Sequence, residues 1–132
     1  MKKYCDIFYQ QGENPVFCYR TSKTVYEEML FQGGLVSCGW NSAGYPLNLL
    51  EKCSSRIDKR HFPEPYAFNI EIDGQSLDYG LEFVDFQKEE KDSTIKSVLT
   101  LKSRIKPVLI KVHTLLDSAA MFTRYIEIEN LS

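Results

Sequence analysis

Hydrophobic and polar residues alternate along most of the chain, most regularly at its C-terminal end. After Pro107, which has no backbone N–H to donate and therefore suits the start of a strand, the alternation runs over 108–112 and resumes over 122–129. A period of two residues, carried by β-branched and aromatic side chains, is typical of half-buried strands. The pattern predicts two strands joined by a break at 117–120, and we expect this pair to form the centre of a sheet.

Arg124 interrupts the apolar side of the second of these strands, between Phe122 and Ile126. A guanidinium on an apolar strand face needs a carboxylate or several carbonyl groups, because an unpaired buried charge is very costly. We predict that Arg124 forms a structural ion pair. An arginine that reaches out to water and a ligand-binding arginine are the alternatives.

The same alternation recurs upstream, and turn-forming residues separate the segments that show it. Gly12 and Pro15 mark one turn, Asp73 followed by Gly74 is a strong signal for a tight two-residue turn, and the charged run at 88–92 marks another. These signals predict further strands at 5–9, 16–21, 35–40, 67–73, 81–87 and 94–102.

Residues 24–32 carry conflicting signals. Thr24 and Glu27 have the spacing of a helical capping box, and the apolar residues that follow Thr24 fall on one helical face. The segment is also partly β-branched and aromatic, and it ends in a pair of glycines at 33–34, as a strand in a hairpin does. The pattern by itself favours a helix, and a hairpin strand is the alternative.

No regular pattern covers 41–66, where glycine, prolines and a basic cluster interrupt the apolar residues. A loop of this length inside a compact domain is uncommon and is usually functional or disordered. A chain of 132 residues has room for one domain with a core of its own. We therefore predict a single all-β domain over 1–132, an antiparallel β-sandwich with a long loop at 41–66.

Charge and hydropathy narrow the range of partners. The formal net charge is −2 and the isoelectric point about 5.7, so the chain lacks the basic surface that nucleic-acid binding requires. It also lacks a run of about 18 apolar residues that could cross a bilayer. We therefore expect neither a nucleic-acid partner nor a membrane.

The four cysteines all lie within the first 53 residues, and none belongs to a Cys-x-x-Cys pair. Together with only two histidines, their spacing does not suit a zinc site. The N-terminal residues lack the long apolar stretch of a signal peptide. We expect reduced, buried thiols in a cytoplasmic protein without a metal or cofactor, and two disulfides in the N-terminal half are the alternative.

Candidate catalytic groups are sparse. Glu127 and Glu129 lie two residues apart on one strand face, close to the carboxylate separation of inverting glycosidases, but alternating glutamates are more typical of a solvated sheet face. The sequence contains no nucleophile-elbow, phosphate-loop or zinc-protease motif. We predict no catalytic residues in this chain.

Trp40, the single tryptophan, ends one predicted strand and opens the 41–66 loop, which also holds Tyr45, Arg60 and His61. Proteins hold sugar rings by stacking aromatic side chains on the apolar face of the sugar while hydrogen-bonding groups contact its hydroxyls. These four residues are therefore our candidates for carbohydrate binding. A tryptophan buried in the core is the alternative.

Three stretches resemble the N-terminal domain of glycoside hydrolase family 36 α-galactosidases. VFCYRTSKTVYEEMLFQGGLVSCGWNSAGYPL is similar to the opening hairpins of that domain, with their aromatic strand, threonine-containing turn and Gly-Leu strand. FPEPYAFNIEIDGQSLDYGLEFVDFQ resembles its later strand that ends in Asp-Gly. KPVLIKVHTLLDSAAMFTRYIEIENLS resembles its long strand, its Asp turn and the arginine-bearing strand that ends in Asn.

The resemblance implies part of a β-supersandwich of the galactose-mutarotase type, with 24–32 as a strand. It also implies that the catalytic aspartates of the family lie elsewhere, in a barrel that needs about 250 residues, so this chain is not itself an enzyme. The sandwich domain of the family is about twice as long as this chain. That length implies that the chain corresponds to only the first part of such a domain.

We therefore expect a non-catalytic N-terminal accessory domain, or a fragment of one, from an α-galactosidase-like glycoside hydrolase, serving assembly and lining a carbohydrate site. The expected partners are a galactoside ligand and either further copies of the chain or C-terminal domains. One alternative is a stand-alone carbohydrate-binding or protein-interaction β-sandwich module. Another is a small mutarotase-like enzyme that uses His61 or His113 with a carboxylate.

Overall fold

The structure is a computed structural model that describes residues 5–21, 24–42, 67–117 and 121–132, with the backbone alone at 38–42. The regular secondary structure of these residues consists of β-strands alone, and all strand pairs are antiparallel. The predicted all-β antiparallel sandwich is confirmed. The strands are β1 (Asp6–Gln10), β2 (Val16–Arg20), β3 (Thr24–Phe31), β4 (Gly34–Ser42), β5 (Glu71–Ile72), β6 (Gln75–Ser76), β7 (Leu81–Lys91), β8 (Thr94–Ser103), β9 (Val108–Asp117) and β10 (Phe122–Asn130).

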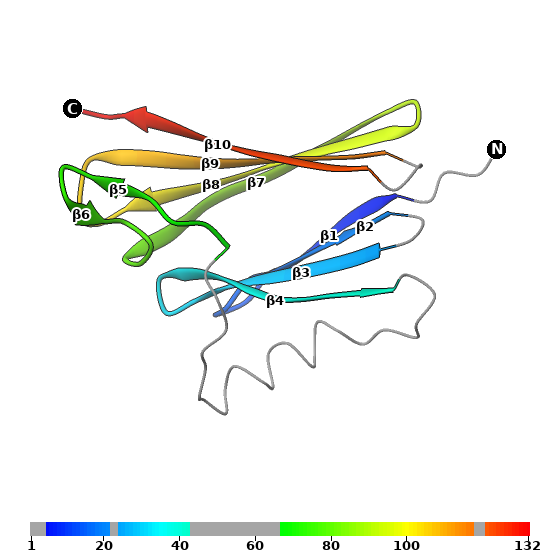
Figure 1. Cartoon of the computed structure of the whole chain (residues 1–132), viewed down its shortest axis with the longest axis horizontal. Helices are drawn as coiled ribbons and strands as arrows, with labels where there is room; N and C mark the ends of the chain where they lie inside the picture. The colour runs from blue at the N-terminus through cyan, green and yellow to red at the C-terminus, as the bar shows by residue number, and fades with distance from the viewer. Residues whose placement is uncertain (1–4, 22–23, 43–66, 118–120) are drawn as a thin grey trace.

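Two four-stranded sheets form the sandwich, and in each sheet the strands follow one another in chain order. The first sheet has the order β1-β2-β3-β4, and the second runs β7-β8-β9-β10 across its width. Figure 1 shows the second sheet as a layer above the first, with the small β5–β6 hairpin at one end. Each sheet is built from sequential hairpins, so the alternation and turn signals in the sequence were sufficient to predict most of its strands.

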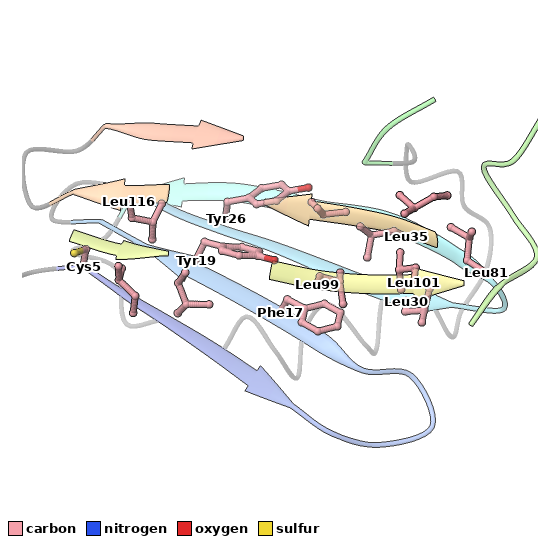
Figure 2. Close-up of a cluster of buried hydrophobic side chains, with 14 residues drawn as sticks. Cys5, Phe17, Tyr19, Tyr26, Leu30, Leu35, Leu81, Leu99, Leu101 and Leu116 are labelled. Carbon is pink, nitrogen blue, oxygen red and sulfur yellow. The ribbon is translucent and has the colours of Figure 1, made fainter. Parts of the chain in front are cut away.

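Side chains from both sheets meet in one apolar core. The most deeply buried members include Ile7, Phe17 and Tyr19 from the first sheet and Leu99 and Ile110 from the second, all at most 1% exposed. Figure 2 shows Phe17, Tyr19 and Leu99 in this core. Burying apolar surface of this kind contributes roughly 25 cal/mol per Å². The core therefore supplies most of the free energy that holds the two layers together.

The helix that the sequence pattern favoured at 24–32 is wrong, because Thr24–Phe31 forms the strand β3. Six consecutive residues from Val25 to Leu30 are buried, so both faces of this strand are covered. A strand buried on both faces shows no polar–apolar alternation, and its apolar residues can fall by chance on a helical stripe. The hairpin alternative is the correct one: Gln32 and Gly33, both with positive φ, form the turn to β4.

The long strand β7 continues through the charged residues predicted to form a turn at 88–92. It ends at Lys91, and the turn to β8 lies at Asp92 and Ser93, with Asp92 in the left-handed region. Lys88 shows why the strand continues, because its Nζ donates a 2.8 Å hydrogen bond to the backbone oxygen of Ile7 in the facing sheet. On an edge strand, charged side chains are compatible with strand geometry.

A β-bulge at Val84 reverses the inward-facing side of β7. Phe83 pairs with Leu101 and Asp85 with Thr100, so Val84 has no opposite residue and is 48% exposed. The bulge allows Phe83 and Phe86, three residues apart, to pack against the same core. Strict alternation in the sequence would have placed these two rings on opposite faces.

The predicted C-terminal pair is formed by β9 and β10, but it does not lie at the centre of its sheet. β9 lies inside the sheet between β8 and β10, whereas β10 is the last strand. The expectation was therefore wrong for β10. A local pattern predicts which neighbouring strands pair, but it does not predict where a strand lies within the sheet. The Asp73–Gly74 turn is confirmed, with both residues at positive φ and Ile72 paired with Gln75.

In the residues that the structure describes, no helix has the length and apolar character needed to cross a membrane. Cys5 and Cys18 are buried cysteines, as expected. The side chain of Cys38 and all of Cys53 lie outside the described residues, as does the 41–66 loop apart from its first two backbone positions.

Candidate functional site

Arg124 and Glu28 form a two-pronged ion pair between the sheets. Arg124 Nη1 and Nη2 donate to Glu28 Oε1 and Oε2 at 2.7 and 2.8 Å, and Arg124 Nε donates to Thr114 Oγ1 at 3.1 Å. The hydroxyls of Tyr19 and Tyr26 donate to the same carboxylate at 2.7 and 3.1 Å. The sequence required a carboxylate or carbonyl partner for Arg124, and the fold provides Glu28 from 96 residues away.

This cluster is largely withdrawn from solvent, since the Glu28 side chain is 0% and the Arg124 side chain 17% exposed. The guanidinium carbon also lies 5.0 Å from the centre of the Tyr19 ring and 5.5 Å from that of Tyr26. Burial alone would lower the pKa of Arg124, but the Glu28 carboxylate raises it above its ordinary value. All the strong hydrogen-bonding positions face protein atoms, so the cluster is structural and is not a ligand site.

Glu27 is also buried, at 3% exposure, but it lies on the opposite face of β3 from Glu28. Burial raises the pKa of Glu27 to about 7, and a hydrogen bond from the Cys18 thiol opposes that rise. Burial and the Glu27 carboxylate together raise the pKa of Cys18 to about 12. The two buried carboxyls of β3 therefore face different environments and cannot act on one substrate, and the Cys18 thiol is unsuited to act as a nucleophile.

The outer face of β9 and β10 carries a second charged group. His113 Nε2 lies 2.8 Å from Glu127 Oε1, and the His113 ring stacks on Tyr125 with centroids 4.3 Å apart. Lys111 pairs with Glu129 at 3.2 Å. The Glu127 and Glu129 carboxylates, each about half exposed, thus pair with His113 and Lys111 on the neighbouring strand, as on a solvated sheet face.

A cleft of about 460 Å³ opens at one end of the sandwich and is called the end cleft below. It lies between the β1–β2 loop, the β3–β4 turn and the start of β7, on the left in Figure 1. Its apolar lining consists of the half-buried rings of Tyr9 and Phe83 and the buried side chains of Leu30 and Leu81. This volume is in the range typical of small-molecule sites.

Polar residues complete the lining of the end cleft. Three of them, Gln11, Asn14 and Gln32, have side-chain amides that make no hydrogen bond among the residues that the structure describes. Glu82 and Arg104 form an exposed ion pair at 3.1 Å. No pattern in the sequence indicates this site, because its residues come from four separate segments and belong to no motif.

The free edge of β10 is the other unusual feature of the surface. Asp117 N donates to Met121 O and Leu131 N donates to Pro107 O, so the odd-numbered residues of β10 face β9. In an antiparallel ladder the hydrogen-bonding direction alternates, which directs the even-numbered backbone groups, from Arg124 to Asn130, away from the sheet. In the described part of the chain no strand pairs with them.

β10 is also poorly covered on its inner face. Ile110 and Ile128 lie opposite each other on adjacent strands and on the same face, yet Ile110 is 0% and Ile128 44% exposed. On the outer face Tyr125 is 54% exposed. Met121 and Leu131, which flank the strand, are 61% and 43% exposed. Phe122 and Ile126 are partly buried against the core. The inner face of β10 is therefore covered along its first half and exposed from Ile128 onward.

The carbohydrate-binding candidates of the sequence cannot be placed. Tyr45, Arg60 and His61 lie outside the described residues, and only the backbone of Trp40 is described, at the end of β4. His113, the other histidine of the proposed mutarotase-like acid–base pair, pairs with Glu127 on the outer face of the second sheet, and neither residue lines the end cleft.

Among the residues that the structure describes, no three His, Cys, Asp or Glu side chains gather closely enough to hold a metal ion. Comparisons with models of protein families, with curated proteins and with solved structures gave no match for this chain.

Proposed function

We propose that this chain is a non-catalytic β-sandwich accessory module of a glycoside hydrolase of the family 36 α-galactosidase type, and that it enters a larger assembly through β10. The observation that carries the proposal is the free, half-covered edge of that strand. An edge strand of nine residues without a proline or a bulge is a ready template for pairing with another strand.

The other exposed edge of the second sheet provides a comparison. β7 carries the bulge at Val84 and a charged end that includes Glu89, Glu90 and Lys91, features that discourage pairing between sheet edges. β10 has neither device, and Ile128 on its inner face remains exposed. This difference supports pairing at β10 and not at β7.

For the isolated chain, we propose that the pairing strand is β10 of a second copy. A two-fold antiparallel pairing centred on Ile126 uses the outward-facing backbone groups of the even-numbered residues. It places Tyr125 opposite Glu127 of the second copy and Thr123 opposite Glu129. No like charges then face each other, which is a requirement for a stable cross-strand pair.

The positions of the two buried glutamates of β3 support the proposal that the chain is not catalytic. Glu28 is neutralised by Arg124, and Glu27 lies on the other face of β3. The absence of catalysis is tested with an aryl α-galactoside. We expect no hydrolysis above the buffer rate, and turnover that is lost in Glu27→Gln or Glu127→Gln would overturn the assignment. The buried Cys18 thiol, which is not in a disulfide, supports a cytoplasmic location.

Assembly through β10 is tested by light scattering coupled to size exclusion across a range of concentrations. We expect a dimer, with twice the 15.3 kDa mass of one chain, and a monomer for Ile128→Lys, because an inward-pointing charge blocks edge pairing. Leu115→Lys is the matched control, since Leu115 is 40% exposed but lies on the interior strand β9. A monomeric wild type, or loss of the dimer in both variants, would overturn pairing at β10.

A further inference from the structure

We propose that the end cleft is a binding site for a neutral pyranoside, separate from the residues around the 41–66 loop. The proposal rests on the carbohydrate-associated role proposed above, and it names a different part of the fold from β10. It is carried by the shape of the end cleft, by its unused hydrogen-bonding groups and by its charge.

The lining of the end cleft is amphipathic in the way that a sugar ring requires. The rings of Tyr9 and Phe83, which stack with centroids 5.5 Å apart, supply the apolar part of the lining together with Leu30 and Leu81. A pyranoside has one face of C–H groups that packs on such a surface and a rim of hydroxyls that does not. The volume of about 460 Å³ accommodates a ligand of this size.

The rim of the end cleft matches the hydroxyls of a sugar. Each side-chain amide of Gln11, Asn14 and Gln32 can both donate and accept hydrogen bonds, as a hydroxyl also does, and none of the three is used within the described part of the chain. Gln32 is held at a φ of +49° in the β3–β4 turn, an uncommon conformation for a residue other than glycine. The hydroxyl of Tyr9, another lining residue, is buried without a hydrogen-bond partner in the described structure.

The charge of the end cleft favours a neutral ligand. Arg104 is paired with Glu82, which leaves the carboxylate of Glu13 uncompensated. An anion such as a phosphate or a uronate would have to compete with Glu82 for Arg104 and would be repelled by Glu13. A neutral sugar incurs neither cost.

The test is a titration of the ¹⁵N-labelled chain with methyl α-galactopyranoside and methyl α-glucopyranoside, with the anionic methyl glucuronide as the control ligand. Glycine amides resonate in a distinct region of the spectrum, and Gly12 and Gly33 line the end cleft whereas Gly74 does not. We expect saturable shifts at Gly12 and Gly33 with a neutral pyranoside, none at Gly74 and none with the glucuronide. Shifts confined to the Trp40 indole would overturn the proposal and move the site to the loop.

Gly12→Phe blocks the end cleft without disturbing the fold, because a Cβ at Gly12 would meet no atom within 4 Å. We expect at least tenfold weaker pyranoside binding in this variant and unchanged binding in Lys96→Phe, an exposed position at the other end of β8. Equal binding by both variants would overturn the proposal, as would the absence of any shift in the wild type. Ile128→Lys distinguishes this proposal from assembly through β10. The variant should be a monomer that still binds the pyranoside, so loss of one property would not imply loss of the other.

Discussion

Arg124 on β10 and Glu28 on β3 join the two sheets by a bidentate ion pair with N–O distances of 2.7 and 2.8 Å. Tyr19 and Tyr26 donate to the same carboxylate, so the pair is buried with nearly all of its hydrogen-bonding positions filled. The contact ties β10, an edge strand of the second sheet, to β3, which has six consecutive buried residues in the first. We infer that it positions β10 and thereby keeps its free edge straight and available.

Glu28→Gln should destabilise the fold by about 3–5 kcal/mol, because it leaves the buried Arg124 guanidinium without a counter-charge. Urea unfolding followed by circular dichroism measures the effect. The control is Glu82→Gln, which breaks the exposed ion pair to Arg104 and should cost less than about 1 kcal/mol. In a double-mutant cycle with Arg124→Met, the two costs should be far from additive. Additive costs would show that the pair contributes no coupling.

The stability of the fold should fall as pH rises from about 4.5 to about 7, because of Glu27. Burial raises its pKa from 4.5 to about 7, so in this window the folded chain retains a proton that the unfolded chain releases. The free energy of unfolding is therefore greatest below pH 4.5 for this group and decreases by roughly 2–3 kcal/mol up to pH 7.

Urea unfolding at several pH values tests this dependence. The difference in unfolding free energy between the wild type and Glu27→Gln should change across the window, because glutamine does not titrate. Glu71→Gln, an exposed substitution on β5, should leave the pH profile of the wild type intact. A constant difference between the wild type and Glu27→Gln from pH 4.5 to 7 would contradict the prediction.

Gly33→Ala should be more damaging than Gly74→Ala, although both glycines have positive φ. At Gly33, with φ +84°, a Cβ would lie 3.0 Å from the backbone nitrogen of Gly80, whereas at Gly74, with φ +77°, it would meet nothing within 4 Å. We expect a cost of about 1 kcal/mol at Gly74 from backbone strain alone and about 2–3 kcal/mol at Gly33, where the contact to Gly80 must also open. Thermal unfolding of the two variants makes the comparison, and equal costs would show that the backbone contact is not tight.

Local signals in the sequence were sufficient for most strands and for the turn at Asp73–Gly74. They failed where the environment of a strand decides its pattern. β3 is buried on both faces and so lost its alternation, and β7 continues through charged residues because Lys88 reaches the facing sheet. The bulge at Val84 also leaves no local signature, because it shows only in the pairing with β8.

The sequence by itself determined the fold class and the need of Arg124 for a partner, because two-residue alternation and the cost of an unpaired charge are properties of a strand and a single side chain. Only the tertiary structure decided that the partner is Glu28, that β10 is an edge and that the end cleft exists. Each of these depends on residues distant in the chain, brought together by the packing of two sheets. No local pattern records which distant segments will meet.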